Sequence, residues 1–148
     1  MFDESHKTTH HVLVPVVSGV VIKKDGKYLL VQEKQPKAYG LWNFPAGQVD
    51  EGESIEMAAV REAKEEVGYD VEIIRKLGVY QANIKTPPKH IFEVKIVGGE
   101  FKIPDDELLD AKWFSFDEIF QLDKEGKLRS ADWMIGATQM LENTINPN

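Results

Sequence analysis

The sequence contains no cysteine. Disulfide bonds and thiolate-held metal sites are therefore excluded, although the compartment is not decided by this absence. No apolar stretch approaches the roughly 20 residues that a membrane-spanning helix needs. The first residues also lack the apolar segment of a secretory signal peptide. We therefore expect a cytoplasmic protein that has no membrane partner.

An excess of positive charge is also missing. The chain carries 25 acidic and 18 basic residues, which gives a formal net charge of −7. Proteins that bind nucleic acid backbones need clustered lysine and arginine, so no nucleic-acid partner is expected. A small substrate that carries phosphate is still compatible with an acidic chain, because a bound cation can supply the attraction.

The 148 residues show no internal repeat, no low-complexity tract and no linker. This length is sufficient for one domain with a buried core, so we expect residues 1–148 to form a single domain. Residues 1–11 are expected to be a flexible tail, whose histidines, His6, His10 and His11, form no metal-binding pattern. A monomer and a homodimer both remain open.

Alternating apolar runs and turn residues predict strands and helices along the whole chain. The best-defined helix follows Ser54, a good N-terminal cap, and stops at Gly68, which suits a left-handed terminus. Strands are expected at residues 12–22, 28–32, 41–44, 71–82, 90–97 and 111–114, and helices at residues 54–67, from Ser115 or Asp117 to Phe120, and at 131–141. This order predicts an α/β (α+β) fold with a mixed sheet between helices.

Three carboxylates lie on one face of the predicted helix. Glu62, Glu65 and Glu66 are spaced i, i+3 and i+4, which places them within an arc of about 100°. Like charges at these spacings repel each other, and the C-terminal end of a helix disfavours anions. Such a face is therefore either solvated or neutralised by a bound cation.

Neighbouring residues favour the cation. Ala58 and Ala59 lie one turn earlier on the same face, so that side is not uniformly charged. Arg61 adjoins the carboxylates and is able to orient one of them. Gly47 and Gly52 flank a tight loop that can bring backbone carbonyls near the helix. Hard oxygen ligands of this kind suit Mg²⁺ or Mn²⁺.

The spacing of these residues resembles the Nudix box of the Nudix (MutT-like) hydrolase family. Gly47 is followed by five residues and Glu53, then by seven residues and Arg61. The pattern then ends with Glu62, Glu65, Glu66 and Gly68, and only Ala63 and Tyr69 depart from the usual bulky aliphatic residues. The flanking segments 41–47 and 110–114 also resemble the family.

The resemblance implies a Nudix-type fold and Mg²⁺- or Mn²⁺-dependent hydrolysis of a diphosphate linkage in a small nucleotide-type substrate. The implied metal ligands are the Gly47 carbonyl, Glu62, Glu65 and Glu66. Arg61 is expected to hold a carboxylate in place, together with Glu53. The general base is either Glu62 or Glu107, which precedes Trp113 by six residues.

Several side chains are candidates for substrate binding. Aromatic rings can stack on a nucleobase, although each ring is also a candidate for the core. Cationic side chains can contact phosphate, although each is also a candidate for an ordinary surface charge. The aromatic candidates are Trp42, Tyr80 and Phe92, and the cationic ones are Lys34, Lys37, Lys89 and Arg129, with His90 as a further contact.

A shorter resemblance concerns the segment Leu128–Ser130 together with residues 41–47. Both are similar to segments of NudJ-type phosphatases, which implies a phosphatase that acts on thiamin-pathway pyrimidine diphosphates and on nucleoside di- and triphosphates. Hydrolysis of 8-oxo-dGTP, ADP-ribose or dinucleoside polyphosphates also remains open. The alternative outside catalysis is a Nudix-fold nucleotide-binding or regulatory module, but such modules commonly lack box carboxylates that this chain retains. A metal-storage domain would not explain the spacing of Gly47, Glu53 and Gly68.

Overall fold

The structure is a computed structural model that describes residues 15–143. The predicted tail at residues 1–11 lies outside the described residues. The strands are β1 (Val17–Lys24), β2 (Lys27–Glu33), β3 (Trp42–Asn43), β4 (Ala46–Gln48), β5 (Tyr69–Tyr80), β6 (Lys89–Gly99) and β7 (Leu108–Ser115). The α-helices are α1 (Ile55–Val67), α2 (Phe116–Lys124) and α3 (Ala131–Asn143), and Pro36–Ala38 form a short 3-10 turn.

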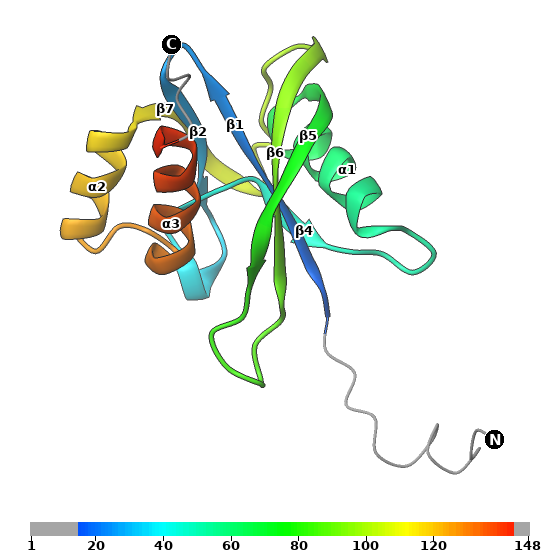
Figure 1. Cartoon of the computed structure of the whole chain (residues 1–148), viewed down its shortest axis with the longest axis horizontal. Coiled ribbons are helices and arrows are strands. Elements are labelled where there is room, and N and C mark those ends of the chain that lie inside the picture. The colour runs from blue at the N-terminus through cyan, green and yellow to red at the C-terminus, as the bar shows by residue number, and fades with distance from the viewer. Residues whose placement is uncertain (1–14, 144–148) are drawn as a thin grey trace.

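The strands form one mixed sheet in which β1 is central. Strand β1 runs parallel to β6 and antiparallel to β2 and β4. The main path through the sheet is β3-β2-β1-β6-β5, and β7 pairs with β2. Helix α1 lies on one side of this sheet, while α2 and α3 lie on the other (Figure 1). The predicted fold class, a mixed sheet between helices, is confirmed.

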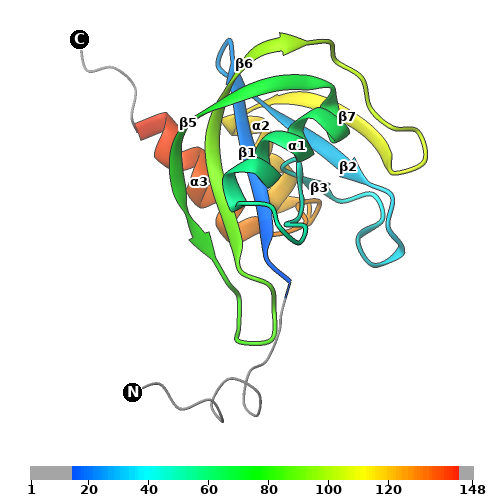
Figure 2. The same ribbon diagram turned by 90° about the vertical axis from the view of Figure 1, so that its right-hand side faces the viewer.

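Alternation along the strands divides the core into two layers. Val20 and Ile22 of β1 pack in the cluster that also contains Ala59 and Ala63 of α1. The intervening Val21 packs in the second cluster, on the side of α2 and α3. Side chains alternate between the two faces of a strand, so β1 supplies both layers. Figure 2 shows α1 lying across the face of the sheet that is opposite to α2 and α3.

The element that the sequence did not predict is β4. A strand was expected at residues 41–44, ending at Pro45–Gly47, but the structure shows only Trp42–Asn43 as β3 and a new strand at residues 46–48. The Pro45 carbonyl accepts a hydrogen bond from the Val20 amide (3.0 Å), and β4 pairs with β1 beyond it. Pairing with a strand distant in sequence thus extends the sheet past the proline.

Other boundaries also differ from the prediction. Helix α2 begins after Ser115, which forms a capping box with Glu118, and it continues to Lys124 rather than ending at Phe120. Strand β5 begins at Tyr69 directly after α1, and β7 begins at Leu108. None of the helices within residues 15–143 is long and apolar enough to cross a membrane.

Candidate metal site and adjoining cavities

Both ends of α1 are fixed, which sets the direction of its carboxylates. At the start, the Ser54 hydroxyl accepts a hydrogen bond from the Met57 amide (3.0 Å). At the end, Gly68 adopts a left-handed conformation with φ 82°. A side chain at Gly68 would collide with the backbone of Glu100, so glycine is required for packing as well as for conformation. The predicted helix and both of its caps are confirmed.

Gly47 brings the β4 backbone against the carboxylate face of α1. A Cβ atom at this position would overlap the Glu62 carboxyl group. The missing side chain therefore allows the Glu62 carboxylate to lie directly beside the strand. This contact places the backbone of β4 next to a carboxylate, so that a backbone carbonyl and a side chain could both reach one cation.

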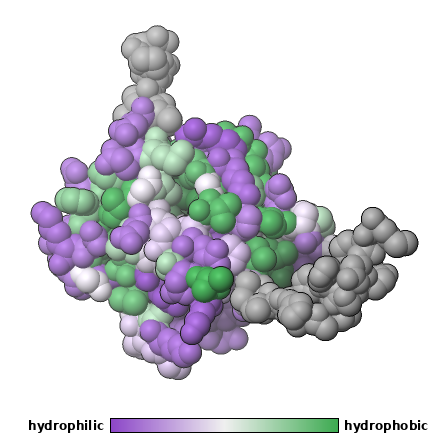
Figure 3. All heavy atoms as spheres, turned by 60° about the horizontal axis from the view of Figure 1, so that its bottom comes forward, coloured by the Kyte–Doolittle hydropathy of each residue, from purple (hydrophilic) through white to green (hydrophobic). Residues whose placement is uncertain are grey.

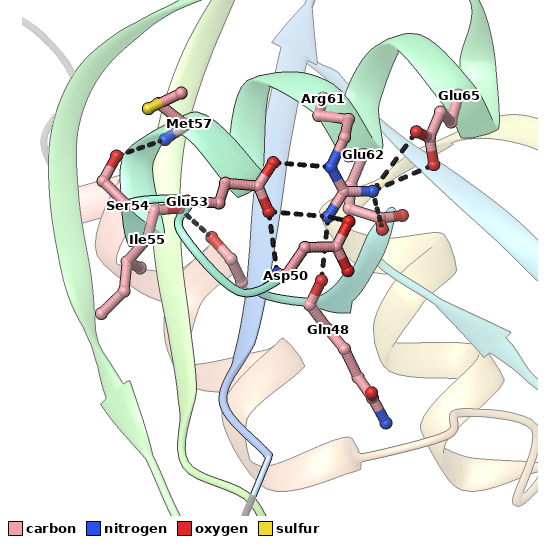
Figure 4. Close-up of polar contacts among 10 residues, drawn as sticks. Gln48, Asp50, Glu53, Ser54, Ile55, Met57, Arg61, Glu62 and Glu65 are labelled. Atoms are coloured by element: carbon pink, nitrogen blue, oxygen red, sulfur yellow. Dashed lines mark hydrogen bonds and ion pairs between the residues drawn. The ribbon is translucent and has the colours of Figure 1, made fainter.

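Arg61 joins the loop before α1 to the helix itself (Figure 4). Its Nε and Nη2 atoms donate to the two carboxylate oxygens of Glu53 at 2.7 and 2.9 Å. Its Nη2 atom also donates to the Gln48 carbonyl (2.9 Å). Its Nη1 atom donates to Glu62 (2.9 Å) and to Glu65 (3.1 Å). One guanidinium group thus fixes β4, the loop and two helical carboxylates relative to one another.

Glu53 is the main partner of this guanidinium group. The paired hydrogen bonds from Arg61 are the largest cause that lowers the pKa of Glu53, to about 2. A further hydrogen bond comes from the Asp50 amide to Glu53 (2.9 Å) and closes the loop. The predicted supporting roles of Arg61 and Glu53 agree with this geometry.

Glu62 and Glu66 are the carboxylates that face inward. Burial raises the pKa of Glu62, and the Arg61 charge opposes that rise. Burial also raises the pKa of Glu66 well above its ordinary value, and the charges of Glu62, Glu33 and Glu107 add to the rise. The Ala46 amide donates one hydrogen bond to Glu66 (3.1 Å). Buried carboxylates with so little compensation need a proton or a cation.

A divalent cation fits this donor set. Glu62 and Glu66 supply buried carboxylates, and Gly47 lies against Glu62 without an intervening side chain. Glu65 does not join them, because its half-exposed side chain pairs with Arg61. Accordingly, no group of three acidic or histidine side chains within residues 15–143 converges as a complete metal cage. The other ligands of a hard cation would come from water and substrate.

Two cavities adjoin these carboxylates. The larger, of about 650 Å³, is lined by Gly47 and also by Tyr80, Lys89 and Arg129. The smaller, of about 410 Å³, contains Glu66 and Glu107. Figure 3 shows the end of the molecule that carries the β5–β6 loop, where hydrophilic residues cover much of the surface. The volume of the larger cavity suits a nucleotide-sized ligand.

The structure sorts the predicted substrate residues into two groups. Tyr80 and Arg129 line the larger cavity, and Glu107 lines the smaller one beside Glu66. Trp42 and Phe92 are instead core residues, with exposed fractions of 7% and 2%, which leaves little ring surface for the predicted stacking on substrate. Trp42 packs edge-on against Phe114 with ring centroids 4.9 Å apart, and Phe92 points into the layer beneath α1.

Sequence reasoning missed Glu33 and Asn43. Glu33 lines both cavities, and its carboxylate accepts a hydrogen bond from the Asn43 side chain (3.1 Å). The sequence placed Glu33 at the start of a polar loop, whereas it ends β2 after an irregularity in the pairing with β7. No local pattern marks either residue, because the sheet brings both to the cavity wall.

Comparison with known proteins agrees with the fold and the site. A NUDIX domain family model matches residues 12–134. A putative 8-oxo-dGTP diphosphatase from Bacillus subtilis is 40% identical over 65% of this chain and 62% of its own length. An ADP-ribose pyrophosphatase from Methanocaldococcus jannaschii is 36% identical over 69% of this chain and 62% of its own length. The chain thus spans less than two thirds of these curated relatives.

A solved structure supports the same relationship over most of the chain. A NUDIX hydrolase from Nitrosomonas europaea superposes with a TM-score of 0.75 at 30% sequence identity. The match covers 87% of this chain and 88% of that chain. The agreement therefore extends beyond the box to the sheet and the helices around it.

Replacing Arg61 with methionine tests the role of the guanidinium group. Arg61→Met leaves the buried Glu62 carboxylate without its cationic partner and frees the loop from the helix. We expect the free energy of unfolding at pH 7 to fall by about 2 kcal/mol, measured by urea denaturation. Because folding lowers the pKa of Glu53 from 4.5 to about 2, its stabilisation is present above pH 4.5 and lost as the pH falls towards 2. The difference between the two proteins should therefore shrink between pH 5 and pH 2.

Lys64→Met is the matched control, since Lys64 lies on the same helix and pairs with Asp70 where both side chains are about half exposed. Its effect should stay within about 0.5 kcal/mol. Equal destabilisation by both variants, or a difference that does not depend on pH, would contradict the central position given to Arg61.

Proposed function

The chain belongs to the Nudix family, and from that membership and the site geometry we propose that it hydrolyses a diphosphate linkage in a nucleotide-type substrate with the help of Mg²⁺. The observation that carries the proposal is the pair of inward-facing carboxylates Glu62 and Glu66, which contact the Ala46–Gly47 backbone that lines a nucleotide-sized cavity. Mg²⁺ is preferred because the available donors are carboxylate and carbonyl oxygens.

Glu62, Glu66 and the Gly47 carbonyl would hold the cation in this proposal. When bound, a divalent cation neutralises charge on the phosphate oxygens and lowers the pKa of an attacking water. Arg61 keeps the Glu62 carboxylate oriented and holds the loop against α1. The cation would also relieve the cost of burying two carboxylates, which explains why the fold keeps them there.

Glu107 is the proposed general base. It lines the smaller cavity together with Glu66 and Glu33, and Glu33 also lines the larger cavity. No hydrogen bond or ion pair within the described residues occupies its carboxylate. Glu62, the other candidate, already accepts a hydrogen bond from Arg61 (2.9 Å). A carboxylate that is free of partners is better placed to accept a proton from water.

Two named relatives act on 8-oxo-dGTP and ADP-ribose, and both substrates contain a diphosphate linkage attached to a nucleoside. We therefore propose a nucleoside polyphosphate or nucleoside diphosphate derivative as the substrate class. A regulatory module without catalysis is less well supported, because every carboxylate of the box is retained and two of them are buried at the cavity.

The function is tested with a nucleotide panel in the presence of Mg²⁺. The panel contains nucleoside di- and triphosphates, 8-oxo-dGTP, ADP-ribose and a dinucleoside tetraphosphate, with product identification by mass spectrometry. We expect turnover of at least one member and a loss of about 10²- to 10³-fold or more in kcat/KM for Glu66→Gln, which keeps the shape but removes the charge.

Glu51→Gln is the control for this variant, because Glu51 is exposed in the turn before α1 and its side chain bonds to no described residue. This control should retain wild-type activity, and both variants should keep the wild-type circular dichroism spectrum. Full activity in folded Glu66→Gln would sink the assignment. Nucleotide binding without any turnover by the wild type would favour the regulatory module.

The assignment of the base is tested with Glu107→Gln. We expect kcat to fall by about 10²- to 10⁴-fold, the usual contribution of a general base, while Mn²⁺ affinity measured by calorimetry stays unchanged. Glu62→Gln, in contrast, should weaken Mn²⁺ binding. A Glu107→Gln enzyme with nearly normal kcat would transfer the role of base to Glu62.

A further inference from the structure

One wall of the larger cavity is cationic. Lys89, the first residue of β6, and Arg129, in the segment before α3, both line it. Neither side chain forms an ion pair with a carboxylate within residues 15–143. A chain with a net charge of −7 thus holds two unpaired cations at one place in its candidate substrate cavity.

Lys89 is held in position by two contacts of its side chain. Its Nζ atom donates to the Ser130 hydroxyl (3.0 Å) and lies 5.3 Å from the centroid of the Trp133 ring. Tyr80 stacks on the same ring, with centroids 6.4 Å apart. Burial lowers the pKa of Lys89, and the charge of Arg129 lowers it further. Holding the Lys89 ammonium group near Arg129 therefore costs the folded protein some free energy.

The backbone fixes the place of Arg129. Its amide donates to the Trp42 carbonyl (2.7 Å), and Leu128 forms a bridge with the same residue. Its side chain is exposed at the cavity wall. The first turn of α3 follows immediately and also lines the cavity, so the positive end of that helix adds to the two cations.

Two acidic side chains, Glu33 and Asp132, line the same cavity. The Glu33 carboxylate is already bonded to the side chains of Asn43 (3.1 Å) and Gln35 (3.2 Å). Its charge opposes the lowering of the Lys89 pKa but does not cancel it. The cationic wall is therefore only partly neutralised by the protein itself.

We propose that Lys89 and Arg129 bind a terminal phosphate of the substrate and select nucleotides that end in a free phosphate group. This inference rests on the proposed function, which it narrows to one substrate class. A terminal phosphate carries about −1.5 to −2 charges at neutral pH, whereas a phosphate esterified on both sides carries about one. Two cations therefore match the terminal group better, and Arg129 can bind its oxygens in bidentate fashion.

The test compares ADP with ADP-ribose, because the two differ only in whether the second phosphate is free or carries ribose. Binding to the metal-free protein is measured by calorimetry in EDTA, and kcat/KM is measured with Mg²⁺. We expect the wild type to bind and turn over ADP in preference to ADP-ribose. Lys89→Gln and Arg129→Gln should each reduce this preference by about 10- to 100-fold.

Lys85→Gln and Lys127→Gln are the matched controls. Lys85 lies in the exposed β5–β6 loop, and Lys127 pairs with Glu125 on the surface (3.1 Å). Neither control should change the preference, which separates a specific contact from a general loss of positive charge. The Arg129 side chain is exposed and bonds to no described residue, so we expect Arg129→Gln to keep the fold. This variant therefore tests the proposal even if Lys89→Gln fails to fold.

Equal affinity of the wild type for ADP and ADP-ribose would overturn the proposal, as would equal losses on both ligands in the two variants. Preferential binding of ADP that depends on Lys89 and Arg129, without turnover, would support the phosphate site while rejecting hydrolysis. Turnover of ADP and ADP-ribose without any preference between them would support hydrolysis while rejecting the terminal-phosphate site. The two proposals therefore fail in different ways.

Discussion

The site depends on the pairing of Arg61 with Glu53. This ion pair lies between the loop and the helix, and the same guanidinium group also reaches the Gln48 carbonyl and the Glu62 carboxylate. Without it, the carboxylates of Glu62 and Glu65 would lose the positive charge that offsets their repulsion, and the loop before α1 would lose its ion pair with the helix. The Arg61 guanidinium group thus sets the geometry in which the carboxylates of Glu62 and Glu66 face inward.

Charges of opposite sign adjoin the larger cavity. Ala46 and Gly47, which contact the carboxyl groups of Glu66 and Glu62, line it together with Lys89 and Arg129. In the proposed function, a cation held by Glu62 and Glu66 would offset their repulsion of a phosphate-bearing substrate, while Lys89 and Arg129 would attract it. Metal binding and substrate binding are therefore linked in this proposal.

Much of the site was predictable because it is local in sequence. Ser54, Gly68 and the spacing of the glutamates are signals within one helix, and the structure confirms the helix with both caps. Strand β4 was not predictable, because its pairing with β1 is a tertiary contact across a proline. The burial of Phe92 depends on which face of β6 meets α1, and the position of Glu33 depends on where β2 ends. Such facts belong to the packed sheet and leave no local pattern.

We propose that Glu62, Glu66 and the Gly47 carbonyl form the metal site. This site is tested by soaking a crystal of the protein in MnCl₂ and collecting anomalous diffraction data at a wavelength where manganese scatters strongly. We expect an anomalous peak in contact with both carboxylates and with the Gly47 carbonyl. Manganese bound only at other carboxylates, or no peak at a millimolar concentration of the ion, would contradict it.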